Sequence, residues 1–258
     1  MSDINYKKSN YLCIQLLANS LQLKLYTFHS MPLENYTYLI ILLSSFFFPF
    51  VFSFDKRVAF FKKWKKIAFS IILPATFFII WDIWFMNRGI WSFNDVYIIG
   101  IKPLGLPIEE WLFFAVIPYC SLFVYEVVKT YFQRLDYNQL MFWGLILLGL
   151  LLLIFAGVFF NRNYTFWCFV LCAIFIAILL FQSWFLEHIT HLTFTFAVCL
   201  IPMLLVNGVL TLMPVVQYNE AQIIGLRIYT IPLEDFVYYL LLLVMNVLIY
   251  ERIDRIKE

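Results

Sequence analysis

Seven long apolar stretches constrain the fold of this chain more than any other feature of its sequence. Each holds about 18 or more mostly apolar residues, which is enough for a helix to cross a bilayer. They lie at residues 36–54, 67–86, 107–128, 140–159, 164–181, 192–213 and 231–250. Backbone N–H and C=O groups find no water in lipid, so such segments must be helices that satisfy these groups internally. The sequence therefore predicts an all-α polytopic membrane protein with seven transmembrane helices.

The composition supports this class and excludes others. Of the 258 residues, 64% are hydrophobic and 13% are charged, with a mean hydropathy of +0.86. A soluble domain carries about 25% charged residues. The net charge of +2 is too small to indicate a nucleic-acid partner, and the glycines form neither a GxGxxG nor a P-loop pattern. We therefore expect no nucleic acid, no nucleotide or flavin cofactor, and no metal.

The distribution of lysine and arginine predicts the orientation in the membrane. They are concentrated in the loop DKRVAFFKKWKK, residues 55–66, and recur on the same side of the membrane at residues 129, 134, 252, 255 and 257. The other side holds only Arg88, Lys102, Arg162 and Arg227 besides those of the first 30 residues. We expect the N-terminus outside and the C-terminus in the cytoplasm. The expected location is the inner (cell) membrane of a bacterium, in contact with membrane lipids.

The first 30 residues differ from the rest of the chain. Polar residues interrupt the run from Tyr11 to Leu25, and the segment lacks a signal-peptide core and a small-residue cleavage site. Met31 would be a sensible start. We interpret residues 1–30 as a doubtful N-terminal extension.

An internal repeat organises the remaining residues. The stretch FNDVYIIGIKPLGLPIEEWLFF, residues 93–114, matches YNEAQIIGLRIYTIPLEDFVYY, residues 218–239, without a gap at an offset of 125 positions. We predict a first three-helix repeat at 31–135, a linking helix at 136–160 and a second three-helix repeat at 161–258. A single linking helix makes the two repeats parallel, related by an axis along the membrane normal.

Each repeat carries two adjacent acids after a proline, in the pattern PxE(E/D). These are Glu109 and Glu110 in the first repeat and Glu234 and Asp235 in the second. A further acid, Asp82, lies inside an apolar helix, where ionisable residues are rare and usually functional. A proline and acids at the first turn of a helix are also explained by helix capping and the helix dipole. The recurrence of the motif favours a functional site that gathers these five acids at one depth.

Two or more carboxyl groups in an apolar wall can hold one proton between them and so provide an acid and a base together. Aromatic faces stabilise cations. An acid in such a pocket suits protonation of an alkene in a lipid that arrives through the bilayer, although aromatic residues at this depth also form interfacial belts. The residues expected to contact a substrate are Trp81, Trp91, Asn94, Trp111, Phe114, Asn207, Asn219 and Tyr239.

The stretches WDIWFMNRGIWSFN, GLPIEEWLFF and IPLEDFVYY make the chain resemble the small-membrane-protein type of lycopene cyclase. This family includes bacterial two-subunit enzymes, archaeal fused versions and the cyclase half of bifunctional fungal carotenoid proteins. The resemblance covers roughly residues 33–251. The order here is similar to two such subunits joined by the linking helix, with one motif at Pro107, Glu109 and Glu110 and the other at Pro232, Glu234 and Asp235.

The resemblance implies a lycopene β-cyclase, an isomerase that turns lycopene ψ-ends into β-rings without a cofactor. Its partners would be lycopene from the bilayer and other enzymes of the carotenoid pathway. By hypothesis, Glu109 or Glu234 protonates the terminal double bond, and Glu110, Asp235 or Asp82 removes a proton from the closed ring. One or two active centres, and a product with one or two rings, remain open at this point.

Other classes of protein are weighed against this one. A proton-coupled membrane transporter of a hydrophobic or small substrate could use the same acids, but it would be expected to have a polar cavity. A retinal photoreceptor needs a lysine inside a helix, and residues 231–250 contain none. The cytoplasmic segment EHITH could place Glu187, His188 and His191 on one helical face, which is a weak metal signal. A purely structural membrane subunit is the remaining alternative.

Overall fold

The computed structural model describes residues 32–133, 135 and 137–255, so the expectation for residues 1–30 lies outside the described residues. Seven helices within this part are long and apolar enough to cross a membrane. They are built on α2 (Thr37–Phe52), α3 (Trp64–Asn87), α4 (Ile108–Tyr131), α5 (Gln139–Val158), α6 (Asn163–Phe181), α7 (Ile189–Leu212) and α8 (Leu233–Arg255). The prediction of an all-α membrane protein with seven spans is confirmed.

Short elements fill the connections. Two-stranded antiparallel ladders join β1 (Trp91–Phe93) to β2 (Val216–Tyr218) and β3 (Arg227–Ile228) to β4 (Ile231–Pro232). The 3₁₀ turns are η1 (Leu33–Tyr36), η2 (Phe60–Lys63), η3 (Asp95–Tyr97), η4 (Pro103–Gly105), η5 (Ser183–His188) and η6 (Glu220–Gln222). The ladders were not expected, because strands of two or three residues leave no alternating pattern in the sequence.

The repeat seen in the sequence recurs in the structure with the same offset of 125 residues. Shifting the bounds of α3, β1 and η3 by 125 reproduces those of α7, β2 and η6. The unusual backbone also recurs, since Gly100 and Gly225 have φ of 85° and 87°, a region that glycine enters readily. The fold is thus two parallel three-helix repeats joined by α5. The division at residues 31–135, 136–160 and 161–258 stays a prediction.

The ladder between β1 and β2 ties the two repeats together at one end of the bundle. Its middle pair is Ser92 and Gln217, which are equivalent residues of the two repeats. The flanking bonds are also equivalent, with Asn94 N donating to Val215 O and Asn219 N to Ile90 O, both at 2.9 Å. An approximate two-fold axis therefore passes through this ladder. We call this end of the bundle, where α4 and α8 begin, the motif end.

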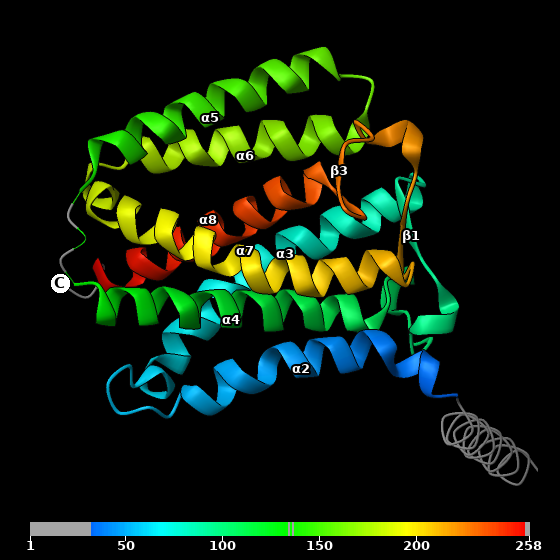
Figure 1. The fold of residues 1–258 in the computed structure, drawn as a ribbon, viewed down its shortest axis with the longest axis horizontal. Coiled ribbons are helices and arrows are strands. Elements are labelled where there is room, and N and C mark those ends of the chain that lie inside the picture. Colours follow the sequence, from blue (N-terminus) through cyan, green and yellow to red (C-terminus); the bar gives the residue numbers. More distant parts are fainter. Residues whose placement is uncertain (1–31, 134, 136, 256–258) are drawn as a thin grey trace, which may run out of the picture.

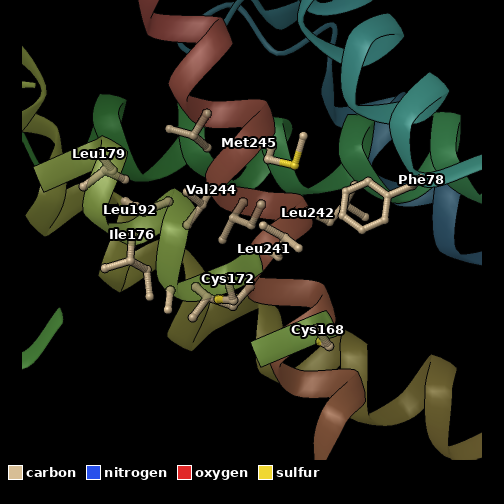
Figure 2. Close-up of a cluster of buried hydrophobic side chains, with 14 of the residues drawn as sticks. Phe78, Cys168, Cys172, Ile176, Leu179, Leu192, Leu241, Leu242, Val244 and Met245 are labelled. Atoms are coloured by element: carbon tan, nitrogen blue, oxygen red, sulfur yellow. The ribbon is translucent and has the colours of Figure 1, made fainter. Parts of the chain in front are cut away.

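Around this axis, α4 and α8 are the central helices. Helix α4 packs on α2, α3 and α7, and α8 packs on α6 and α3. Helices α5 and α6 lie together along one edge of the bundle and α2 along the opposite edge (Figure 1). Figure 2 shows the core where α8 meets its neighbours, with Leu241, Leu242 and Val244 of α8 lying among side chains of α6 and Phe78 of α3.

The end of the bundle opposite the motif end is held by two ion pairs in which the acids are buried. Lys63 Nζ lies 2.5 Å from Glu126 Oε2, and Lys129 Nζ lies 2.7 Å from Glu251 Oε1. Tyr250 also donates to Glu126 Oε1 at 2.5 Å. Glu126 and Glu251 are equivalent in the two repeats, and each is neutralised by a lysine. We interpret these two acids as structural.

Replacing a core side chain of α8 tests this packing. Leu241 is fully buried, so Leu241→Ala should lower the free energy of unfolding by about 2 kcal/mol or more, because the surrounding helices cannot close the space completely. Leu147 on α5 is 59% exposed, and Leu147→Ala is the matched control. Thermal unfolding in detergent measures both, and equal midpoints for the two variants would contradict the packing described here.

Candidate active site

The four motif acids lie on the first turns of the two central helices. Pro107 precedes α4 directly, so Glu109 and Glu110 fall in its first turn, and Glu234 and Asp235 fall in the first turn of α8. All four are buried, with at most 7% of the residue exposed. Buried carboxyl groups need hydrogen-bond partners, and those partners separate the acids into two kinds.

Glu110 and Asp82 form a pair. The Tyr38 hydroxyl donates to Glu110 Oε2 at 2.6 Å, and the Tyr238 hydroxyl donates to Asp82 Oδ1 at 2.8 Å. The two carboxyl groups also lie within hydrogen-bonding reach of each other. A hydrogen bond between two carboxyl groups requires that one of them carries a proton. This arrangement is suited to storing one exchangeable proton between α3 and α4.

Asp235 has a different environment. Tyr164 donates to Oδ1 at 2.8 Å, Tyr218 donates to Oδ2 at 2.8 Å, and Asn207 donates to Oδ2 at 3.3 Å. Asn207 stands at the position equivalent to Asp82. The second repeat thus replaces the partner carboxyl by an amide that donates a hydrogen bond, and three donors surround a single acid.

Glu109 and Glu234 instead accept hydrogen bonds from backbone N–H groups. Glu109 Oε1 accepts from Ile99 N, and Glu234 Oε1 accepts from Ile224 N, both at 2.7 Å. Thr165 adds a bond to Glu234 Oε1 at 2.5 Å. The first acid of each motif therefore fixes the loop that leads into its own helix, and this role repeats with the motif.

A cavity of about 460 Å³ lies between α2, α4, α7 and α8 and runs from the motif end past the middle of α4. Asp82, Glu110 and Asp235 line it, whereas Glu109 and Glu234 do not. Its remaining wall is mostly apolar and aromatic, and its volume is in the range of small-molecule sites. The aromatic residues in the wall are Tyr38, Phe48, Trp91, Phe93, Phe113, Tyr164, Tyr218, Tyr238 and Tyr239. A transporter would be expected to have a polar cavity, whereas the cavity around these acids is mostly apolar.

Three of the residues expected to contact a substrate line this cavity, namely Trp91, Asn207 and Tyr239. The other five lie elsewhere. Asn94 and Asn219 accept from the backbone of Val96 and Ala221 and so cap the turns η3 and η6. The remaining three are outside the cavity wall, namely Trp81, Trp111 and Phe114. An aromatic or polar residue near a motif in sequence need not face the same space, because successive helical residues point in different directions.

Sequence reasoning missed three tyrosines that bind the cavity acids, namely Tyr38, Tyr164 and Tyr218. A tyrosine in an apolar segment signals such a role, because its hydroxyl usually finds a partner when buried. Tyr218 lies in β2, outside the spans. Burial first, and then the neighbouring Asp235 carboxylate, raise the pKa of the Tyr218 hydroxyl well above its usual range. Tyr218 therefore stays protonated and acts as a donor.

The EHITH segment lies at the other end of the bundle. His188 Nε2 is 3.5 Å from Glu187 and 3.7 Å from Glu251, while His191 Nε2 lies 3.2 Å from the carbonyl oxygen of Phe132. Among the residues that the structure describes, no group of three histidine, cysteine or acidic side chains is arranged to hold a metal ion.

The sequence model of one protein family, described as lycopene cyclase, matches residues 35–128 and 161–253. The chain belongs to the lycopene cyclase family. The two matched segments cover nearly all of α2 to α4 and of α6 to α8 and leave out the linking helix α5. Both cavity-lining motif acids, Glu110 and Asp235, fall inside them.

A curated relative of this lycopene cyclase family member is a bifunctional lycopene cyclase/phytoene synthase from Phycomyces blakesleeanus. It is 32% identical over 91 residues, which cover 32% of this chain and 15% of the relative. No solved structure matches the chain.

The loop role of Glu109 can be tested through stability. Glu109→Ala leaves the buried Ile99 N–H without its acceptor, which should lower the free energy of unfolding by about 1–3 kcal/mol. Glu109→Gln keeps a carbonyl oxygen that can accept the same bond, so it should cost clearly less. Thermal unfolding in detergent distinguishes them. Equal losses for both variants would contradict a loop-holding role.

Proposed function

We propose that the protein is a lycopene β-cyclase, which closes the acyclic ψ-ends of lycopene to β-rings to give γ-carotene and then β-carotene. The observation that carries this proposal is the cavity that brings three carboxyl groups, Asp82, Glu110 and Asp235, into one aromatic wall. Membership of the lycopene cyclase family and the likeness to a bifunctional lycopene cyclase/phytoene synthase support the choice of substrate.

The acid in this mechanism is the Asp82–Glu110 pair. It holds a proton in an apolar wall next to the space where an alkene would lie. General acid catalysis needs the donor within reach of the reacting carbon, and of the five acids only cavity-lining ones meet this condition. The first acids of the motifs, Glu109 and Glu234, become positioning residues in this proposal, in place of the donor role hypothesised from the sequence.

The base is Asp235. Its three donors, Tyr164, Tyr218 and Asn207, suit a carboxylate that keeps its charge, because hydrogen bonds to the charged form stabilise it. The second repeat has Asn207 at the position equivalent to Asp82. The two repeats therefore have different roles, since the first stores a proton and the second accepts one.

The reaction balances without a redox partner. The acid adds a proton to the terminal carbon–carbon double bond of the ψ-end and leaves a tertiary carbocation. The electron pair of a second double bond in the same end attacks this cation, so a carbon–carbon bond forms and closes the six-membered ring. The base then removes a proton from the ring, which restores a double bond. One proton enters and one leaves, and the product is an isomer.

The aromatic wall has a role in the middle of this sequence. Trp91, Tyr238 and Tyr239 line the cavity together with the acids, and aromatic faces attract cations by about 0.5–2 kcal/mol each. The wall also excludes water, which would otherwise add to the carbocation and give an alcohol.

The site would be reached from the membrane. We propose that the protein lies in the inner membrane of a bacterium with its motif end outside, because the loops at the opposite end carry most of the lysine and arginine. Lycopene, membrane lipids and other enzymes of the carotenoid pathway are the proposed partners.

Cyclisation in heavy water tests the chemistry. Protein purified into liposomes with lycopene should give cyclic product that gains about one mass unit for each ring closed in D₂O, since the proton that is added comes from an exchangeable carboxyl and the proton that is lost comes from carbon. Mass spectrometry of the extracted carotenoids measures this. Cyclic product without deuterium would contradict a carboxyl donor, and no cyclic product at all would contradict the proposed function.

Substitution of the acids tests the assignment of roles. Asp82→Asn and Glu110→Gln should each lower the cyclisation rate by about 100-fold or more, because general acid catalysis of this kind contributes about 10²–10⁴-fold. Glu109→Gln is the matched comparison within the same motif and should lose far less. If Glu109→Gln loses as much as Glu110→Gln at equal amounts of folded protein, the assignment is wrong.

A further inference from the structure

The two repeats differ in side-chain size where the cavity lies. On α7 the cavity is lined by Met203, Val206 and Leu210, among others. At the equivalent positions of α3, 125 residues earlier, stand Phe78, Trp81 and Phe85. Rotation about the approximate two-fold axis would place the part of the cavity next to α7 where these three aromatic residues of α3 lie.

The three aromatic side chains of α3 are packed into the core. Phe78 and Phe85 are fully buried, and Trp81 is 5% exposed. Their rings pack in series, with centroids 5.6 Å apart from Phe78 to Trp81 and 5.3 Å apart from Trp81 to Phe85. Phe78 also meets the ring of Tyr238 at 4.8 Å. These rings occupy the volume that Met203, Val206 and Leu210 leave open, and we call them the α3 plug.

The bundle is open to its surface on the side of the cavity and closed on the side of the α3 plug. The cavity wall includes Phe48 of α2 and Leu205 of α7, which are 63% and 68% exposed, so the wall continues to the surface between α2 and α7. On the equivalent side, Trp84 of α3 meets Trp167 of α6 with ring centroids 5.7 Å apart. Helix α5 covers α6 there, and α2 lies at the opposite edge from α5 (Figure 1).

We infer that a carotenoid end group enters laterally from the hydrocarbon of the bilayer between α2 and α7, and that the protein has one reaction cavity because the α3 plug fills its counterpart. This inference rests on the proposed function for the identity of the ligand. One cavity holds one end group, so the two ends of lycopene react in separate events. The monocyclic compound is therefore an intermediate that precedes the bicyclic product.

Transplanting the plug tests the inference. Val206→Trp copies Trp81 into the cavity wall, and Leu205→Trp adds bulk at the entrance. Each should lower the cyclisation rate at least tenfold. The matched control is Ile80→Trp, because Ile80 of α3 is the equivalent of Leu205 and is 64% exposed on the plugged side. It should retain the wild-type rate. Thermal unfolding in detergent identifies a variant that has failed to fold, and Leu205→Trp is the variant expected to disturb the core least.

Lycopene binding provides a readout that does not need turnover. In the Glu110→Gln background, quenching of tryptophan fluorescence by added lycopene should reach its end point at one lycopene per protein. Adding Leu205→Trp should weaken binding at least tenfold, and adding Ile80→Trp should not. Saturation at two lycopene molecules, or equal effects of Leu205→Trp and Ile80→Trp, would overturn the inference.

The time course completes the test. Wild-type protein should accumulate the monocyclic product before the bicyclic one, and bicyclic product without a monocyclic precursor would overturn the inference. Lycopene could bind at one molecule per protein, with weaker binding in Leu205→Trp but not in Ile80→Trp, and never be cyclised. In that case the lateral cavity stands and the proposed function fails. If wild type cyclises lycopene and Leu205→Trp does so equally fast, the proposed function stands and the inference fails.

Discussion

The antiparallel ladder between β1 and β2 is the constraint on which the site depends. It pairs Ser92 with Gln217 across the approximate two-fold axis and so holds the two loops that lead into the motifs against each other. Each loop is then fastened to its own helix by the first motif acid, through Glu109 and Ile99 or through Glu234 and Ile224. The second motif acids, Glu110 and Asp235, consequently line the same cavity. Loops anchored in this way can present carboxyl groups in a fixed geometry, which acid–base catalysis requires.

Duplication explains the scaffold, and departures from the duplication explain the site. Equivalent residues that stay alike, such as Glu109 and Glu234 or Glu126 and Glu251, hold the structure in both halves. Two sets of equivalent residues that differ either face the cavity or fill the space equivalent to it. Asp82 becomes Asn207, which turns a carboxyl pair into a single acid with an amide donor. A series of rings on α3 becomes Met203, Val206 and Leu210 on α7, which opens a space for a ligand.

Much of the fold followed from the sequence, because the physical requirements of a bilayer are severe. The apolar run at 107–128 corresponds to α4 at Ile108–Tyr131, and the run at 192–213 to α7 at Ile189–Leu212. The gathering of Asp82, Glu110, Asn207 and Asp235 also followed from the parallel repeat. The separate roles of Glu109 and Glu110 did not. Adjacent residues of a helix point about 100° apart, and only the structure shows which one meets the loop and which one the cavity.

The central claim is that Asp82 and Glu110 share a proton in the wall of the cavity. Infrared spectroscopy of the purified protein tests it directly, because a protonated carboxyl has a C=O stretching band that ionised carboxylates lack and that shifts in D₂O. We predict such a band in wild type and its loss in both Asp82→Asn and Glu110→Gln, since either change removes the pair. A wild type that lacks such a band would contradict the account. A band that persists unchanged in both variants would contradict it as well.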